Sequence, residues 1–130
     1  MPTHDDIALM AHLMRRAGFG ATRGELEECT SRGYEATVEE LKTRLDRRES
    51  FLLLDVREPQ EFEICRIPGS VLIPLGDLPS RLSELEGRDD MIVHCKSGVR
   101  SGKAVRLLRE AGYSKARNLK GGILAWINRI

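Results

Sequence analysis

The chain has 130 residues, enough for one ordinary domain, and 41% of them are hydrophobic, as is typical of globular proteins. Its 21 Lys and Arg residues nearly balance 20 Asp and Glu residues, so the net charge of +1 gives no general attraction to nucleic acid. The longest apolar runs, such as residues 51–54, are too short to cross a bilayer, and Asp5 and Asp6 stand where a secretory leader would be basic. We therefore expect a cytoplasmic protein that binds neither nucleic acid nor membrane.

The first part of the chain has the pattern of short helices. Apolar residues recur at helical spacing over residues 4–17, and Thr22 with Glu25 forms a capping-box pattern that predicts a second helix over residues 22–33. These residues are too few to bury a core of their own. We predict a helical N-terminal extension over residues 1–34, followed by one domain over residues 35–130.

Strand and helix patterns alternate along this predicted domain. Thr37 with Glu40 predicts the start of a helix, and apolar runs at residues 51–56, 71–73 and 91–94 predict buried strands. Helical patterns occupy residues 59–64, 78–85 and 101–111. Strands that alternate with helices are typical of an α/β fold with a parallel sheet covered on both faces.

The three cysteines, Cys29, Cys65 and Cys95, are widely spaced, which argues against a disulfide framework and a zinc site. Cys95 differs from the others because it follows a predicted strand and precedes a short loop and a helix. We predict no metal and no cofactor, and a buried small apolar residue remains the alternative interpretation of Cys95.

The loop after Cys95 is suited to holding an anion. It consists of Lys96, Ser97, Gly98, Val99, Arg100 and Ser101, and backbone N–H groups of a tight loop that enters a helix converge on its centre. A helix N-terminus and nearby Lys or Arg favour the thiolate form of a cysteine, so we expect Cys95 to be a reactive nucleophile. A loop this short predicts a positive φ at Gly98, and Lys96 and Arg100 would assist the binding of an anionic donor.

A cysteine followed by an arginine is also typical of cysteine-dependent phosphatases, whose signature has five residues between the two. Only four residues separate Cys95 from Arg100. A shorter ring of backbone donors leaves less room for a tetrahedral phosphate, whereas a single sulfur atom still fits. A small phosphatase or arsenate reductase therefore stays an alternative, as does a docking module without catalysis.

Five segments in order resemble motifs of the rhodanese family. They are Asp-Val-Arg-Glu at residues 55–58, Arg-Ile-Pro-Gly-Ser at 66–70, Ile-Pro-Leu at 73–75, the cysteine loop at 95–101, and Leu-Lys-Gly-Gly-Ile-Leu-Ala-Trp at 119–126. The closest likeness is to rhodanese domains fused behind adenylating enzymes of molybdopterin and thiamine biosynthesis. This likeness implies a five-stranded parallel sheet and a Cys95 persulfide that carries sulfane sulfur from thiosulfate or a persulfide donor to a thiophilic acceptor. A protein with a C-terminal Gly-Gly is a possible acceptor.

Several residues near these motifs have structural interpretations. We expect Asp55 and Arg57 to form an ion pair that supports the loops, and His94 to point to the face of the strand opposite Cys95. Cys65, which stands where many relatives have glycine, is interpreted as a core or loop thiol rather than a second sulfur carrier. Trp126 is expected to anchor the last helix in the core.

Overall fold

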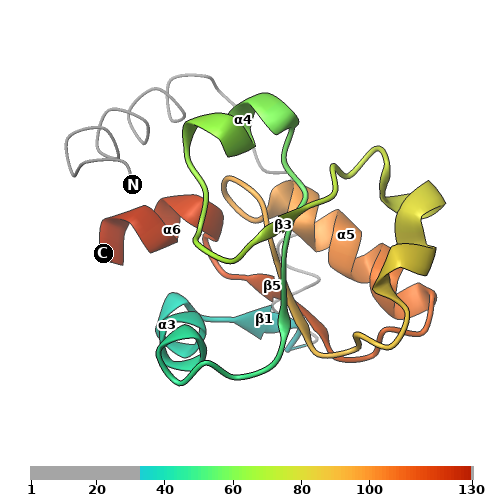
Figure 1. Cartoon of the computed structure of the whole chain (residues 1–130), viewed down its shortest axis with the longest axis horizontal. Coiled ribbons are helices and arrows are strands. Elements are labelled where there is room, and N and C mark those ends of the chain that lie inside the picture. Colours follow the sequence, from blue (N-terminus) through green and yellow to red (C-terminus); the bar gives the residue numbers. More distant parts are fainter. Residues whose placement is uncertain (1–32, 130) are drawn as a thin grey trace.

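The computed structural model describes residues 33–129, which form one sheet with helices on both faces (Figure 1). The sheet is five-stranded and parallel throughout, in the order β1-β5-β4-β2-β3. This confirms the α/β fold with a five-stranded parallel sheet. The elements along the chain are β1 (Glu35–Ala36), α3 (Val38–Asp46), β2 (Leu52–Asp55), α4 (Pro59–Ile64), β3 (Val71–Leu72), the 3-10 helix η1 (Leu78–Leu85), β4 (Met91–His94), α5 (Val99–Glu110), β5 (Ala116–Leu119) and α6 (Gly122–Arg129).

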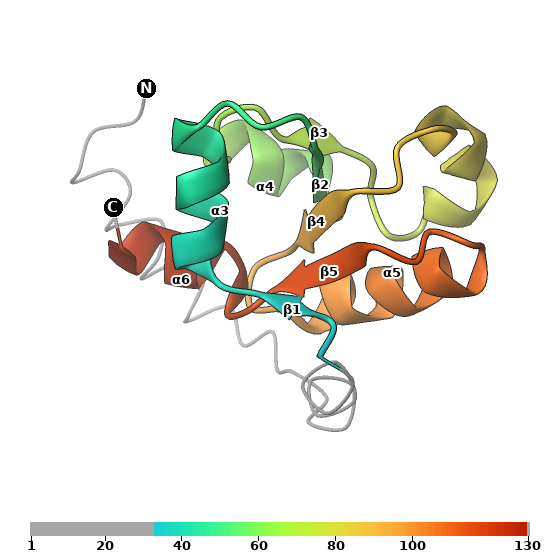
Figure 2. The same ribbon diagram turned by 90° about the horizontal axis from the view of Figure 1, so that it is seen from below.

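Apolar side chains fill a core on each side of the sheet. One core includes Val93 of β4 together with Val105 and Leu108 of α5, and the other includes Leu41 of α3 with Ile123 of α6. Figures 1 and 2 show α3 and α6 close together, with α5 across the sheet from them. Both faces of the central strands are therefore buried, as expected for a parallel sheet.

Local sequence explains several of the element boundaries. The Thr37 side chain accepts a hydrogen bond of 3.1 Å from the backbone N–H of Glu40, which caps α3 as the sequence predicted. All four residues of β2 and all four of β4 are buried, in agreement with their continuous apolar runs. Both strands end at the same edge of the sheet, where the Cys95 loop begins.

The structure differs from several predictions made from the residue pattern, and others fall outside it. Residues 71–73 were predicted to form a buried strand, but in β3 Val71 is exposed and Leu72 is only half-buried, because β3 is at the edge of the sheet. The pattern predicted neither β1, which has two residues, nor β5, whose Ala-Arg-Asn-Leu sequence is too polar to resemble a buried strand. Residues 78–85 form a 3-10 helix, and Pro79 in its first turn lacks a backbone N–H. The helices predicted at residues 4–17 and 22–33 lie outside the described residues. Within the described part of the chain, no helix is both long and apolar enough to span a membrane.

Candidate active site

Cys95 lies directly after β4, near the middle of the sheet, and its sulfur is at the N-terminus of α5. The backbone N–H of Gly98 donates a hydrogen bond of 3.1 Å to Cys95 Sγ, and the Ser101 hydroxyl oxygen lies 3.2 Å from the same sulfur. The residue is only 1% exposed. A backbone donor at a helix start is placed to stabilise negative charge on the sulfur during a reaction.

Gly98 has the positive φ that the short loop predicted. Its φ is 110° and its ψ is −6°, and it forms the N-cap of α5. An L-residue rarely adopts this backbone conformation, so glycine allows the chain to turn directly from β4 into the helix. The turn brings the Gly98 N–H back to the sulfur three residues before it.

The N-terminus of α6 holds the opposite side of the loop. The backbone N–H of Ile123 donates to the Cys95 carbonyl at 2.9 Å, and the N–H of Leu124 donates to the Lys96 carbonyl at 3.1 Å. In a trans peptide the N–H points opposite to the C=O, so the N–H groups of Lys96 and Ser97 face away from α6. Helix α6 thus fixes the orientation of two loop amides.

Gly122 makes this close approach possible. A Cβ at this position would lie 2.4 Å from the Lys96 carbonyl oxygen and 2.8 Å from the Cys95 carbonyl oxygen. The φ of Gly122 is 60°, which also favours glycine. The second glycine of the Gly-Gly pair is therefore part of the support for the cysteine loop.

Asn118 of β5 is a polar contact that the sequence reasoning missed. Its Oδ1 lies 2.5 Å from the Ser101 hydroxyl, and its Nδ2 donates to the Gly98 carbonyl at 2.9 Å. Asn118 is 1% exposed and Ser101 is fully buried. Asn118 could have been identified from the sequence only if β5, the strand just before Gly-Gly, had been predicted.

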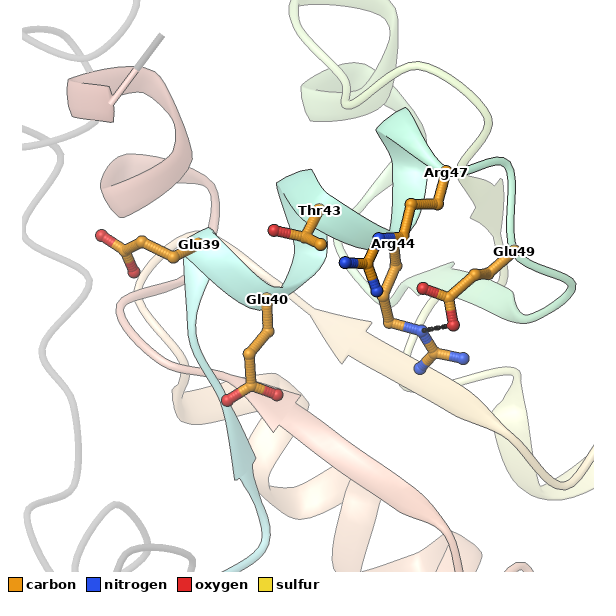
Figure 3. Close-up of a pocket in the computed structure, with 6 residues that line it drawn as sticks. All are labelled: Glu39, Glu40, Thr43, Arg44, Arg47 and Glu49. Carbon is orange, nitrogen blue, oxygen red and sulfur yellow. Dashed lines mark ion pairs between the residues drawn. The ribbon is translucent and has the colours of Figure 1, made fainter.

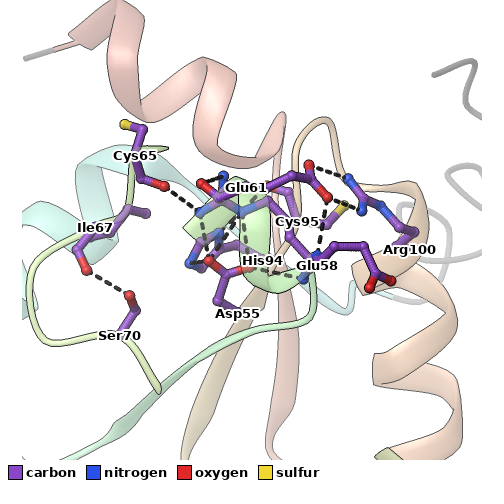
Figure 4. A network of polar contacts seen from close by, with 10 residues as sticks. Asp55, Glu58, Glu61, Cys65, Ile67, Ser70, His94, Cys95 and Arg100 are labelled. Carbon is purple, nitrogen blue, oxygen red and sulfur yellow. Dashed lines mark hydrogen bonds and ion pairs between the residues drawn. The ribbon is translucent and has the colours of Figure 1, made fainter. Parts of the chain in front are cut away.

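Arg100 forms a bidentate ion pair with Glu61 of α4. Its two terminal nitrogens lie 2.6 Å and 3.0 Å from the two carboxylate oxygens, as Figure 4 shows. Burial alone would raise the carboxyl pKa of Glu61, but the hydrogen bonds from Arg100 and from the Glu58 backbone, together with the charges of Arg100 and Arg57, outweigh it, and the pKa lies below its ordinary value. The sequence reasoning did not identify Glu61, which lies 39 residues before its partner.

The other loop side chains differ in exposure. Lys96 is only 3% exposed, and burial lowers the pKa of its ammonium group despite the nearby Glu61 carboxylate. Ser97 and Val99 are half-buried. Of the predicted loop residues, Gly98 and Ser101 contact the Cys95 sulfur, and Arg100 is paired with the Glu61 carboxylate.

Behind the loop, Asp55 and Arg57 form the buried ion pair that the sequence predicted. The Arg57 Nη2 lies 2.7 Å from Asp55 Oδ2 and 2.6 Å from the Cys65 carbonyl oxygen. Both side chains are fully buried. The pair ties the end of β2 to the end of α4.

His94 joins this buried network instead of activating the cysteine. Its Nε2 lies 3.8 Å from Asp55 Oδ2, and its Nδ1 lies 3.5 Å from the Cys95 carbonyl oxygen. Burial lowers the pKa of His94 to about 4, so the ring is neutral at pH 7. A neutral ring turned toward Asp55 agrees with the prediction that His94 points to the face of the strand opposite Cys95.

Cys65 and Trp126 belong to the core on the α3 and α6 side of the sheet. Cys65 is 7% exposed, and burial raises the pKa of its thiol, which makes it less reactive. In Figure 4 its sulfur points away from Cys95. Trp126 is partly buried and packs against the same cluster, which confirms its predicted packing.

A separate open pocket of about 350 Å³ lies along α3 and contains no thiol or imidazole (Figure 3). Within it, Arg44 lies 3.7 Å from Glu49 and also binds Asp90 at 2.6 Å. Over residues 33–129, no group of three His, Cys, Asp or Glu side chains could hold a metal ion. The pocket is lined by Glu39, Glu40, Thr43, Arg44, Arg47 and Glu49.

Residues 37–129 match the model of the rhodanese-like domain family. The chain belongs to this family. It is 39% identical over 92 residues to a sulfurtransferase of Allochromatium vinosum, a match that covers 71% of this chain and 86% of the relative. It is 35% identical over 121 residues to the putative sulfur carrier protein YrkF of Bacillus subtilis, with 93% of this chain and 63% of the relative covered.

The resemblance to domains of adenylating enzymes is also confirmed. The probable adenylyltransferase/sulfurtransferase MoeZ of Mycobacterium tuberculosis is 37% identical over 102 residues, which cover 77% of this chain and 26% of that protein. Among solved structures, a possible tyrosine phosphatase from Rhodopseudomonas palustris is 24% identical with a TM-score of 0.71, covering 85% of this chain and 93% of that chain. At this identity the match to the possible phosphatase shows the shared fold alone.

The relatives named as sulfurtransferases, from Allochromatium vinosum and Mycobacterium tuberculosis, support a sulfurtransferase.

Proposed function

We propose that the chain moves sulfane sulfur from thiosulfate or a persulfide donor to a thiophilic acceptor through a persulfide on Cys95. The observation that carries the proposal is the Cys95 sulfur at the start of α5, which receives the Gly98 N–H at 3.1 Å. Such a donor stabilises negative charge on sulfur at no cost of reorganisation. The proposed loop contribution is electrostatic, and no general base is required for a cysteine that reacts as its thiolate.

The reaction has two displacement steps. The Cys95 thiolate attacks the outer sulfur of thiosulfate, a new S–S bond forms, and sulfite leaves with the electron pair of the broken bond. An acceptor such as cyanide or a thiolate then attacks the outer sulfur of the persulfide, and Cys95 leaves as the thiolate. No electron is gained or lost overall, so no cofactor is needed. A protein with a C-terminal Gly-Gly remains a proposed physiological acceptor, and the cytoplasm, where thiols stay reduced, remains the proposed location.

Phosphate transfer is the weaker alternative because of Arg100. A phosphatase of this loop type needs its arginine to hold two oxygens of the phosphate. Here the same guanidinium face is taken by Glu61 at 2.6 Å and 3.0 Å. A carboxylate in that position opposes a phosphate dianion that the arginine would have to hold, whereas a persulfide on Cys95 bears at most one negative charge, which the loop amides can stabilise.

The decisive experiment is intact-mass and peptide mass spectrometry after incubation with thiosulfate. Trypsin separates the three cysteines, because Cys29, Cys65 and Cys95 fall in peptides 24–32, 58–66 and 89–96. We expect one added sulfur on peptide 89–96, and loss of thiosulfate:cyanide sulfurtransfer in Cys95→Ser. Cys65→Ser is the matched control and should keep activity. Full activity in Cys95→Ser, or hydrolysis of an aryl phosphate with no sulfur loading, would contradict the proposal.

A further inference from the structure

One hydroxyl proton lies between two acceptors beside the nucleophile. The Ser101 oxygen is 3.2 Å from Cys95 Sγ and 2.5 Å from Asn118 Oδ1. A serine hydroxyl has one proton to donate and two lone pairs to accept with. All three residues are at least 99% buried, so water does not readily replace either partner.

The orientation of the Asn118 amide is fixed by a second contact. The Gly98 carbonyl can only accept, so the group that faces it at 2.9 Å must be the Nδ2 amide. The Oδ1 atom then faces Ser101, and it too can only accept. Ser101 therefore donates its proton to Asn118 Oδ1, which is the nearer of the two acceptors. The lone pairs of the Ser101 oxygen then face Cys95 Sγ.

Lone pairs suit a protonated sulfur but oppose a charged one. A Cys95 thiol can donate its S–H to the Ser101 oxygen, whereas a thiolate needs a donor in that place. Rotation of the hydroxyl from Asn118 to Sγ supplies the donor and leaves Asn118 Oδ1 without it. Formation of the thiolate therefore costs the hydrogen bond between Ser101 and Asn118, and this loss makes the thiolate less stable relative to the thiol.

We propose that Asn118 is a positioning residue that holds the Ser101 proton while Sγ is uncharged and releases it as Sγ becomes a thiolate. The part that concerns catalysis rests on the proposed function. In a Cys95 persulfide the charge is on the outer sulfur, and Ser101 donates to Asn118. When an acceptor attacks the outer sulfur and the S–S bond breaks, the electron pair moves to Sγ, and the hydroxyl turns to it.

Alkylation of Cys95 tests the proton placement without any sulfur transfer. The rate of iodoacetamide modification is followed on tryptic peptide 89–96 as a function of pH. Asn118→Leu removes the competing acceptor, so the midpoint should move down by about one pH unit, a tenfold change in the thiolate to thiol ratio. Ser101→Ala should move the midpoint up.

The double variant separates positioning from a general disturbance of the loop. In the Ser101→Ala background there is no proton to release, and Asn118→Leu should leave the midpoint unchanged. The proposal would be overturned if Asn118→Leu moved the alkylation midpoint equally with and without Ser101. It would also be overturned if Asn118→Leu moved the midpoint up while Ser101 is present. Urea unfolding checks the fold, and Asn118→Ala is the second variant if leucine prevents folding.

Single-turnover discharge tests the catalytic part. Enzyme loaded with sulfur is mixed with cyanide, and thiocyanate is measured. Asn118→Leu should speed discharge several-fold when Ser101 is present and have no effect in the Ser101→Ala background. If Cys95 takes up no sulfur at all, the proposed function fails, whereas the alkylation midpoints still decide the role of Asn118. A discharge rate that is unaffected by Asn118→Leu, despite a lowered midpoint, would refute the catalytic part alone.

Discussion

Gly122→Ala tests whether the contact between α6 and the cysteine loop determines both stability and activity. The added Cβ would lie 2.4 Å from the Lys96 carbonyl oxygen and 2.6 Å from the Lys96 carbonyl carbon, which are backbone atoms that cannot rotate away. The left-handed conformation at φ 60° costs an alanine about 1–2 kcal/mol. Relief of the clash also weakens the two hydrogen bonds from Ile123 and Leu124, each worth about 0.5–1.5 kcal/mol. We expect the free energy of unfolding to fall by about 2–5 kcal/mol.

Gly87→Ala is the matched control. Gly87 has a φ of 80°, and a Cβ there would meet nothing within 4 Å. This variant therefore has the backbone strain without the clash and should lose only about 1–2 kcal/mol. Urea unfolding of both variants, followed by circular dichroism, gives the difference that belongs to the contact between α6 and the loop.

Activity gives a second measurement. Displacement of the loop carbonyls by the new methyl group turns the attached N–H groups, so sulfur loading of Cys95 should fall sharply in Gly122→Ala under conditions where it is still folded. Gly87→Ala should load as the unmodified chain does. The reasoning is refuted if the two variants are destabilised equally, or if folded Gly122→Ala loads sulfur at the normal rate.

Three further changes test the polar groups around the site. Arg57→Met leaves the buried Asp55 carboxylate without its cation and should cost about 3–5 kcal/mol of stability in urea unfolding, with partial recovery in Asp55→Asn/Arg57→Met; no loss would contradict the structural role. Because burial lowers the pKa of His94 from 6.5 to about 4, the unfolded chain binds the proton first, and stability should decline as pH falls from 6.5 to about 4; His94→Gln should flatten this decline, and an unchanged slope would exclude His94 as its source. Glu61→Gln removes the negative charge that faces Arg100 and should raise kcat/KM for thiosulfate several-fold in steady-state assays, whereas a decrease would mean that Glu61 positions Arg100 for the donor.

The cysteine loop could be predicted well because its determinants are close together in the sequence. Cys95 follows an apolar run that forms β4, and Gly98 follows three residues later with the expected positive φ. The ion pair of Asp55 and Arg57 was equally local, because the two residues are two positions apart at a strand end. Short-range geometry of this kind is set by the backbone itself.

The side chains that contact Arg100 and Ser101 could not be predicted, because they belong to segments that are distant in the sequence. Glu61 reaches Arg100 across 39 positions, and Asn118 reaches Ser101 across 17. Asn118 in addition lies on β5, whose register next to β4 places Asn118 opposite Val93. Only the strand order brings Asn118 to the loop, and the residue pattern did not predict β5.

The ion pair of Arg100 and Glu61 bears on which donors the loop accepts. The nucleophile, the helix start and the loop amides would stabilise either a sulfur anion or a phosphate oxygen, so they do not discriminate between the two. Arg100 does discriminate between them, because the Glu61 carboxylate that it binds neutralises the positive charge that would otherwise attract a dianion. The same reasoning extends to donors of different charge: thiosulfate is a dianion, and a persulfide bears at most one charge at its reacting sulfur. With Glu61 in place, the site should discriminate less against persulfides than against thiosulfate. A Glu61→Gln variant should therefore gain more activity with thiosulfate than with a low-molecular-weight persulfide, and equal gains would show that the ion pair does not act through donor charge.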